Sequence, residues 1–343
     1  MKATKTASGK WMVNAFIGTD SSGKQMRKKF IGTDKKTVML EASEFVLNHR
    51  NDNISDSFGA VSAAFLLTCN NMSPSTVRGY THIDGMLQKQ YPQFYSMQCF
   101  SITAGEMQSV VDAIGDAGKS AKTVWNYYSY ICSVLKFKQI RPPYVRLPER
   151  RRPDLDIPDE FTVKKTLLAA KDKSTELWIC IALAATGPLR EGEISALQFT
   201  YDTDVDFKAG TIHVSHDYVL GADELYHLKS PKTQSSDRTI TILPYIMSAI
   251  QDQGYVTHWS PKEIYNKFTR LCRDEGIPHY RFHDLRHYCA SMLHAKGFPD
   301  AYIQQRTGHS SAEILRKVYT HTLDSEQKKI DSKMLKELAR VVE

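Results

Sequence analysis

The first fifty residues contain short runs in which apolar and polar positions alternate. Two of these runs, KWMVNAFIG and MRKKFIGTD, flank the polar segment TDSSGKQ, which contains a glycine. Strand-like runs joined by a polar turn with glycine are typical of a hairpin. The next run, KKTVMLEASEFVLNHR, carries the apolar residues Val38, Leu40, Phe45 and Val46, which favours a helix. We therefore predict a small sheet followed by a helix over residues 1–50.

Residues 58–142 have the apolar spacing of helices. They follow the polar segment NDNISDS, which we interpret as a linker. Ser or Thr begins each of four runs, SAAFLLTCN, SPSTVRGYTHIDGMLQKQY, TAGEMQSVVDAIGDAG and SAKTVWNYYSYICSVLKFKQI. These residues are favoured at helix starts because their side chains accept hydrogen bonds from free backbone N–H groups. The pattern predicts an all-α domain, either a plain bundle or one that meets a phosphate backbone.

The stretch PPYVRLPERRRPDLDIPDE is predicted to be a second linker, because repeated prolines stiffen a chain and prevent helix formation. After it, helical and strand-like runs follow one another up to residue 343. The strand-like runs fall within TIHVSHDYVLGADELYHLKSPKTQSSDRTITILP. Residues 159–343 are therefore expected to form the largest domain, of mixed α and β structure.

A break interrupts the most apolar helix of this domain. The run WICIALAATGPLREGEISALQF, residues 178–199, predicts a buried helix that stops at Gly187 and Pro188. A second helix then begins, with Arg190 and Glu193 one turn apart. Taken alone, such a pair is most often a structural ion pair.

The run RFHDLRHYCASMLHAKG, residues 281–297, places His283, Arg286 and His287 on one turn of a predicted helix, since residues three and four apart share a face. The buried stripe of this helix is expected to consist of Leu285, Cys289, Met292 and Leu293. Three interpretations of the polar turn are open. They are a solvated cationic surface, a metal site and a phosphate site.

The metal interpretation rests on the four-residue spacing of His283 and His287, which is that of the HExxH zinc helix. Asp284 stands where that motif has Glu, and Arg286 would place a cation against the metal. An imidazole beside a guanidinium fork suits a phosphate better. The sequence therefore predicts no metal ligands at this turn.

Three further residues stand near predicted element ends. Lys232 lies in a turn before the strand RTITIL, His309 follows Gly308 at the end of a helix, and Tyr319 lies ten residues further on. Singly, each has an ordinary explanation, such as an exposed turn lysine or a packed tyrosine.

Length and composition narrow the class of protein. A chain of 343 residues exceeds what one core normally supports, so two or three domains are expected. No uninterrupted apolar run is long enough to span a membrane, and MKATKTASGK lacks the apolar core of a signal peptide. Six scattered cysteines without a CxxC pair indicate reduced, buried thiols. These features favour a cytoplasmic protein, with no membrane partner.

The charge is concentrated at the N-terminus. Ten Lys and Arg against four Asp and Glu give residues 1–50 a net charge of +6, out of +7 for the chain. A basic leading domain suggests a polyanionic partner, although a solubilising extension is the alternative. A two-stranded ribbon fits the DNA major groove. The candidate DNA contacts on the hairpin are therefore Lys10, Trp11, Lys24, Arg27, Lys28 and Lys29.

Taken in order, the C-terminal motifs resemble the tyrosine recombinase (phage integrase) family. They are TG-x-x-R-x-x-E-x-x-x-L, S-P-K-T-x-x-S-x-R-x-I, H-D-L-R-H, G-H-S-S and V-Y-T-H, and the resemblance covers essentially the whole chain. Within this family, the chain is similar to integrases of phages and integrative conjugative elements. Two departures concern fine positioning. Gly187 and Arg190 are separated by two residues where many members have one, and Thr307 stands where Leu usually precedes Gly-His.

The resemblance implies a multidomain α+β fold in three parts. Residues 1–50 would be a basic arm-type DNA-binding domain with a small three-stranded sheet plus a helix. Residues 58–142 would be a helical core-binding (SAM-like) domain. Residues 159–343 would be a mixed, mainly-α catalytic domain with a small antiparallel sheet and a C-terminal tail helix.

The resemblance also implies a reaction, in which duplex DNA is cut and rejoined through a covalent 3′-phosphotyrosine without metal, ATP or another cofactor. Phosphodiester exchange of this kind needs fixed positive charge around a phosphate. The implied roles are nucleophile for Tyr319, base for His283, acid for Lys232, hydrogen-bond donor for His309, clamps for Arg190 and Arg286, and support for Glu193 and His287.

The implied partners are duplex DNA, at core crossover sites and separate arm sites, and further copies of the chain. The tail LDSEQKKIDSKMLKELARVVE shows helical spacing of Ile330, Met334, Leu338 and Val341. It either packs on its own domain or, as the resemblance suggests, docks on a neighbouring protomer in a tetramer on DNA. Directionality or DNA-bending proteins are possible accessory partners.

Three other functions are alternatives to a recombinase. A type IB topoisomerase would use similar chemistry but needs no separate basic arm. A DNA-binding regulator would lack reacting groups, whereas all the residue types are present. A zinc hydrolase is the third, and metal analysis of the purified protein distinguishes it.

Overall fold

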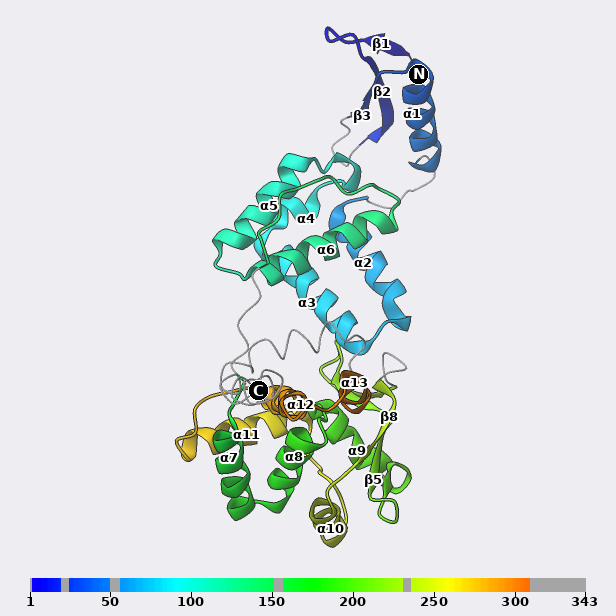
Figure 1. Ribbon diagram of the computed structural model, residues 1–343. Coiled ribbons are helices and arrows are strands. Elements are labelled where there is room, and N and C mark those ends of the chain that lie inside the picture. The colour runs from blue at the N-terminus through cyan, green and yellow to red at the C-terminus, as the bar shows by residue number, and fades with distance from the viewer. Residues whose placement is uncertain (1, 20–24, 50–55, 151–156, 231–235, 309–343) are drawn as a thin grey trace, which may run out of the picture. The chain divides into compact units, whose positions relative to one another are not determined.

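A computed structural model of the chain describes residues 2–19, 25–49, 56–150, 157–230 and 236–308. It separates into two compact units, residues 1–151 and 152–343, each of which has its own hydrophobic core. Figure 1 shows the order of the helices and strands along the chain. The mixed α and β class expected from the sequence is confirmed, with many helices and small antiparallel sheets.

The first unit begins with a three-stranded antiparallel sheet, whose strands pair in chain order (Figure 1). The strands are β1 (Ala3–Lys5), β2 (Trp11–Thr19) and β3 (Gln25–Gly32), and helix α1 (Lys35–His49) follows. The alternating pattern predicted β2 and β3, and the apolar residues of the next run predicted α1. Strand β1 has only three residues, too few to give a pattern of its own.

Helix α1 covers one face of this sheet. Val13 and Ala15 of β2 are fully buried against Val38 and Ala42 of α1. Gly32 permits this packing, because a side-chain carbon at that position would lie 2.7 Å from Val38. The other face of the sheet has no helix over it among the described residues.

The rest of the first unit is a helical bundle. Its elements are α2 (Phe58–Thr68), α3 (Pro74–Gln90), α4 (Pro92–Ser96), α5 (Ala104–Asp116) and α6 (Ala121–Phe137), with 3₁₀ turns at Cys69–Asn71 and Cys99–Ser101. Ser57, Thr103 and Ser120 cap three of the helices by accepting a backbone N–H. The sequence pattern started the first helix at Ser62, whereas the structure starts it directly after the cap Ser57.

Residues 145–148 lie against this bundle, although the sequence pattern places them in the second linker. The side-chain amide of Gln108 on α5 donates to the Arg146 carbonyl at 3.0 Å, and its oxygen accepts the Arg146 N–H at 2.7 Å. Trp125 on α6 donates its indole N–H to the Pro148 carbonyl at 3.0 Å. These side chains satisfy backbone groups that have no partner in a helix or strand.

The described part of the second unit consists of helices and two small sheets. Its helices are α7 (Glu160–Lys173), α8 (Thr175–Thr186), α9 (Glu191–Asp204), α10 (Pro244–Gln253), α11 (Pro261–Asp274), α12 (Phe282–Ala295) and α13 (Asp300–Thr307). Strands β4 (Val205–Asp206), β5 (Thr211–Val214) and β8 (Arg238–Thr241) form one sheet, and β6 (Asp217–Leu220) pairs with β7 (Tyr226–Lys229).

Helix α8 is the centre of this unit. Every residue from Leu177 to Ala185 is buried, and α7, α9, α10, α11 and α12 contact the helix. The helix ends at Thr186 and α9 begins at Glu191, so the structure has the break that Gly187 and Pro188 predicted. All six cysteines are buried and free, as expected from their spacing. Within the described ranges, no helix is both long and apolar enough to cross a membrane.

Candidate active site

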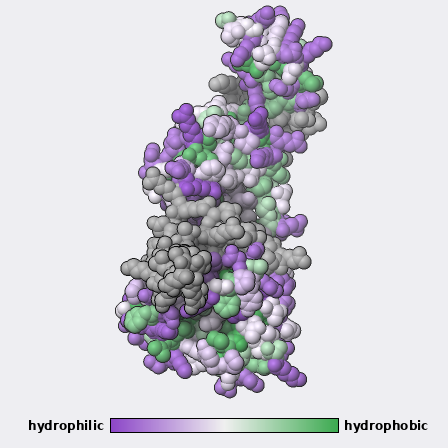
Figure 2. All heavy atoms as spheres, viewed as in Figure 1, coloured by the Kyte–Doolittle hydropathy of each residue, from purple (hydrophilic) through white to green (hydrophobic). Residues whose placement is uncertain are grey.

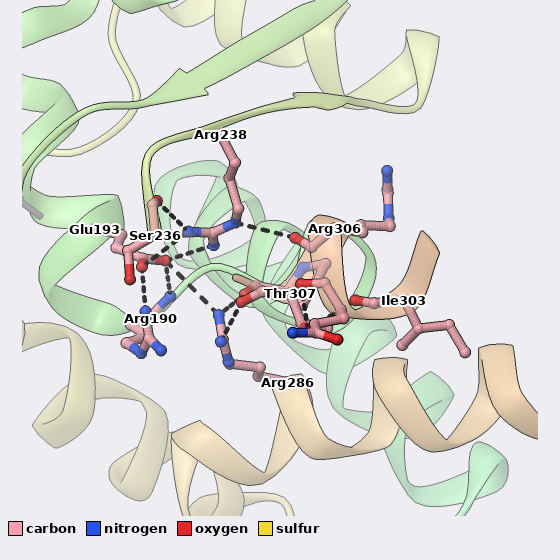
Figure 3. A network of polar contacts seen from close by, with 10 residues as sticks. Arg190, Glu193, Ser236, Arg238, Arg286, Ile303, Arg306 and Thr307 are labelled. Carbon is pink, nitrogen blue, oxygen red and sulfur yellow. Dashed lines mark hydrogen bonds and ion pairs between the residues drawn. The ribbon is translucent and has the colours of Figure 1, made fainter. Parts of the chain in front are cut away.

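Arg190 and Glu193 lie at the start of α9 and contact each other directly (Figure 3). Arg190 has an extended backbone just before the helix, so its N–H has no helical partner. The carboxylate of Glu193 folds back to accept this N–H at 2.9 Å and the Arg190 guanidinium at 2.5 Å. The three-residue spacing thus lets one carboxylate fix both the backbone and the side chain of Arg190.

A second guanidinium, that of Arg238 on β8, holds the same carboxylate from the other side. Its two Nη atoms donate to the two oxygens of Glu193 at 3.1 and 2.8 Å. Its Nε donates to the carbonyl of Arg306 at the end of α13, at 3.0 Å. Arg238 therefore joins α9, β8 and α13.

The third guanidinium belongs to Arg286 on α12, and the structure buries it completely. Its Nη1 donates to the Pro188 carbonyl at 2.6 Å, and its Nη2 donates to the Thr307 carbonyl. The nearest distance from Arg286 to the Glu193 carboxylate is 3.9 Å. Arg286 therefore bridges the loop before α9 and the end of α13.

The two departures from the family pattern fit this network. The extra residue after Gly187 lets Leu189 enter the core while the Pro188 carbonyl faces Arg286. Thr307 is fully buried, and its hydroxyl donates to the Ile303 carbonyl at 2.7 Å, so the polar group is satisfied within α13. Neither departure displaces Arg190 or Arg286 from the cluster.

The cluster has a surplus of positive charge, because Arg190, Arg238 and Arg286 share the carboxylate of Glu193. Burial alone would raise the pKa of Glu193, but the guanidiniums outweigh it and hold this pKa at about 2. The Arg190 side chain is 33% exposed, whereas those of Arg238 and Arg286 are 3% and 0% exposed. One reachable guanidinium backed by two buried ones is suited to an external anion such as a phosphate.

An acidic residue of β6 lies at the edge of this cluster. Gly192 allows the approach, since a side-chain carbon there would lie 1.9 Å from a carboxylate oxygen of Asp217. Burial, with the charge of Glu193, raises the pKa of Asp217. Asp217 therefore lies close enough to the cluster to interact electrostatically with both Glu193 and Arg190.

His283 and His287 lie beside the cluster on the first turns of α12. Their rings meet edge to face, with centroids 4.9 Å apart. Burial, together with His287 and the nearby arginines, lowers the pKa of His283 to about 3, and burial lowers that of His287 to about 4. Both imidazoles are therefore neutral at physiological pH. A neutral imidazole is able to accept a proton from a reacting group.

The lowered pKa of His283 predicts a pH-dependent stability. The unfolded chain, with a pKa of 6.5 at this residue, binds a proton between pH 6.5 and about 3 that the folded chain does not bind. Stability is therefore complete above pH 6.5 and falls as the pH drops through this window. The variant His283→Gln should lower the slope of unfolding free energy against pH by up to about 1.4 kcal/mol per pH unit. Urea unfolding at several pH values measures this slope, and an unchanged slope would contradict the assignment.

The structure brings together five of the predicted site residues. They are Arg190, Glu193, His283, Arg286 and His287. The other three, Lys232, His309 and Tyr319, lie outside the described residues, as do the hairpin residue Lys24 and the tail after Gly308. In the described ranges no group of three or more His, Cys, Asp or Glu is placed to hold a metal ion.

Two expectations for α12 need correction. The predicted stripe is buried at Leu285 and Cys289 but only half-buried at Met292 and Leu293. Arg286 is fully buried, so the interpretation of this turn as a solvated cationic surface is wrong for this residue. Arg286 shares a helix face with Phe282 and Ala290, which are four residues away on either side, and both of these are buried.

Sequence reasoning assigned no role to Arg238, although a signal was present. In the run RTITIL, Arg238, Ile240 and Ile242 are spaced two residues apart, and both isoleucines are buried. Residues two apart on a strand share a face, so this pattern places the arginine on the buried side. A buried arginine requires an acidic partner.

Comparison with known proteins gives consistent similarities in sequence. Residues 159–326 match the model of the phage integrase family. The chain is 25% identical to prophage integrase IntR of Escherichia coli (strain K12), over 60% of this chain and 59% of that protein. It is 24% identical to the ICEBs1 integrase of Bacillus subtilis (strain 168), over 97% of this chain and 99% of that protein. The chain thus spans about three fifths of IntR but nearly all of the ICEBs1 integrase.

The fold is similar to those of two solved structures. One is the Tn1549 transposon integrase in complex with a circular intermediate DNA, with a TM-score of 0.65, 17% identity and coverage of 82% of this chain and 100% of that chain. The other is a lambda integrase tetramer bound to a Holliday junction, with a TM-score of 0.57, 15% identity and coverage of 93% and 95%. At these identities the similarity establishes the fold.

Proposed function

We propose that this chain is a site-specific DNA recombinase. Its residues 159–326 match the phage integrase family model, and the chain resembles the tyrosine recombinases of phages and integrative conjugative elements. It would cut and rejoin duplex DNA and thereby integrate or excise a mobile element. The observation that carries the proposal is the partly exposed guanidinium of Arg190, which lies beside a neutral imidazole and is backed by two buried arginines.

In the proposed reaction, the hydroxyl oxygen of Tyr319 attacks a DNA phosphorus atom and forms a 3′-phosphotyrosine. The phenol proton passes to His283, whose ring is neutral before DNA binds. The negative phosphate would raise the pKa of this ring from its low value and so make it a stronger base. The bond to the 5′-oxygen breaks, and this oxygen takes a proton from Lys232. Rejoining reverses these steps with a new 5′-hydroxyl, so the bond energy is conserved and neither ATP nor metal is needed.

The arginines would stabilise the extra negative charge of the five-coordinate phosphate. Arg190 would contact a phosphate oxygen directly, and its hydrogen bonds to Glu193 would fix its direction. Arg286 would act through its charge from the interior, and direct contact requires DNA binding to uncover its guanidinium. His309 would donate a further hydrogen bond, and His287 would support the ring of His283.

Arm-site binding is proposed for the uncovered face of the N-terminal sheet. The side chains of Asn14, Phe16, Arg27 and Lys29 are exposed there, since Arg27 pairs with Phe16 and Lys29 with Asn14 across β2 and β3. In the region of residues 2–49, hydrophilic residues are frequent on the surface in view, and apolar residues lie among them (Figure 2). A narrow β-ribbon, such as the one that β2 and β3 form, fits the DNA major groove, where the four base pairs are distinguishable.

The candidate arm residues divide between the two faces of the sheet. Lys28 pairs with the buried Ala15, and its ammonium lies 4.3 Å from the ring centroid of Phe45 on α1. Trp11 packs against the same core, with Lys5 and Lys35 over its ring. We therefore assign Lys28 and Trp11 to stabilising the domain, and Arg27 and Lys29, with the exposed Lys10, to DNA contact.

The neighbouring lysines of β3 give a matched test of this assignment. Lys29→Ala should weaken binding to arm-site DNA and lower the slope of log affinity against log salt by about 0.9, the value for one lost phosphate contact. Lys28→Ala should lower thermal stability and leave the affinity of the folded protein nearly unchanged. Fluorescence anisotropy over a salt series measures both. Equal effects of the two substitutions would contradict the division between the faces.

Assembly on DNA is part of the proposal. Exchange between two duplexes requires four strand cuts, and with one Tyr319 in each protomer this calls for four protomers. The tail with Ile330, Met334, Leu338 and Val341 would dock on the adjacent protomer, and directionality or DNA-bending proteins would set the direction. The experiment for the function is incubation with DNA that joins the element ends, followed by a search for a protein–DNA adduct that survives denaturation.

A further inference from the structure

Arg238 is a buried charge for which the proposed reaction has no step. The residue is 5% exposed and lies on β8, in line with the buried residues Ile240 and Ile242. An unpaired charge in such surroundings is strongly unfavourable, so the partners of Arg238 indicate what it does.

The planar guanidinium of Arg238 donates hydrogen bonds to its partners in fixed directions. Nη1 and Nη2 contact separate oxygens of Glu193, at 3.1 and 2.8 Å, which is the two-point geometry that a planar guanidinium offers a carboxylate. Nη1 also donates to the Ser236 carbonyl at 3.0 Å, and Nε donates to the Arg306 carbonyl at 3.0 Å. These contacts set the plane of the Glu193 carboxylate.

Arg190 depends on the same two oxygens (Figure 3). Oε1 of Glu193 accepts from both Arg238 and the Arg190 guanidinium, and Oε2 accepts from both Arg238 and the Arg190 N–H. The direction of the partly exposed Arg190 side chain is therefore determined by a carboxylate whose own orientation is determined by Arg238.

We infer that Arg238 is a positioning residue for DNA cleavage, which acts through Glu193 to direct the Arg190 guanidinium at the phosphate. The inference rests on the proposed function. Arg238 itself does not reach DNA, because its side chain is 3% exposed. Through the Arg306 carbonyl it also holds the end of α13, after which the chain continues to His309.

Two substitutions separate the effect of the Arg238 charge from the effect of its two-point hydrogen bonding to Glu193. Arg238→Lys keeps a positive charge but loses the two-point contact, and Arg238→Met removes both. Since small misplacements of a reacting group cost up to about 10²-fold in rate, we expect Arg238→Met to slow adduct formation by about 10²-fold, with a smaller loss for Arg238→Lys. DNA affinity should stay nearly unchanged in both, because neither alters the DNA-facing surface.

The pH profile gives a readout that a purely structural role would not change. Glu193 faces Arg190, Arg238 and Arg286, with Asp217 on the neighbouring β6. Burial raises the pKa of Glu193, and Arg238 is one of the charges that lower it. Without Arg238 this pKa is higher, so the carboxylate becomes protonated at a higher pH. As the pH is lowered, the cleavage rate of Arg238→Met should therefore begin to fall at a higher pH than that of the wild type.

Two further variants serve as controls. In Glu193→Gln no carboxylate remains to be oriented, so adding Arg238→Met should cost little more, and the extra pH effect should vanish. Arg306→Met removes a guanidinium that also ties α13 to its neighbours, at the Thr186 and Thr241 carbonyls, without touching Glu193. It should lower stability without the pH effect.

The test compares adduct formation by the full-length variants on the joined-end DNA, with thermal unfolding to confirm the fold. An active wild type establishes the proposed function, so a failure of that function is recognised separately. Selective loss in Arg238→Lys or Arg238→Met, and no further loss in the double variant, supports the inference. Wild-type rates in Arg238→Lys and Arg238→Met, a double variant whose losses multiply, or loss only in variants that are unfolded would overturn it.

Discussion

Replacing Tyr319 by Phe is expected to abolish DNA cleavage while DNA binding stays nearly unchanged. The substitution removes the hydroxyl oxygen that attacks phosphorus and leaves the aromatic ring, so the bond to DNA cannot form. Gel analysis under denaturing conditions measures the adduct, and a mobility shift under native conditions measures binding. The matched control is Tyr302→Phe, because Tyr302 is an exposed tyrosine of α13 that stacks on Phe298 and has no part in the proposed reaction.

The control variant should form adduct at the wild-type rate. An adduct that still forms with Tyr319→Phe would move the nucleophile to another residue. Loss of activity in Tyr302→Phe as well would mean that the assay reports on the fold of α13 and not on the attacking oxygen.

Removal of either arginine of the polar cluster should slow cleavage by roughly 10²–10³-fold, the scale for loss of one fixed charge donor at a developing anion. The two variants should differ in stability. Arg190→Ala removes a partly exposed side chain and leaves Glu193 paired with Arg238. Arg286→Ala empties a fully buried space and frees the Pro188 and Thr307 carbonyls.

Single-turnover cleavage rates and unfolding temperatures together test this pair. The control is Arg273→Ala on α11, whose side chain is 74% exposed and pairs only with Asp274 among the described residues, and it should change neither quantity. A near-normal rate in Arg190→Ala would reduce that residue to a structural ion pair. Equal unfolding temperatures for Arg190→Ala and Arg286→Ala would contradict the buried position of Arg286.

Local patterns predicted the helices and strands well where chemistry and periodicity agree. Gly187 and Pro188 marked the break between α8 and α9 because neither residue continues a helix easily. The five-residue α4 was not predicted, since it is too short to show a period. The alternation in β2 and β3 predicted strands, but it could not show that α1 covers the side of Lys28 and leaves that of Lys29 uncovered.

The sequence indicated that several of the candidate site residues would lie together, but not how they are held. The spacing of Arg190 and Glu193 implied contact, because three residues on a helix make one turn. The burial of Arg286 and the part played by Arg238 were not predicted, because both depend on carbonyl and carboxylate groups far away in the chain. The roles of all the candidate site residues stay predictions, and Lys232, His309 and Tyr319 also lie outside the described residues.

The central claim is tested most directly by locating the bond between protein and DNA. The full-length chain is incubated with joined-end DNA that is nicked close to the crossover, so that religation is prevented, and the adduct is digested with trypsin. Mass spectrometry should find nucleotide attached through its 3′-phosphate to Tyr319, in the peptide that follows Lys317, and the cut DNA should end in a free 5′-hydroxyl. Attachment at another residue, attachment through a 5′-phosphate, or DNA that is bound and cut without any covalent bond to the protein would contradict the account.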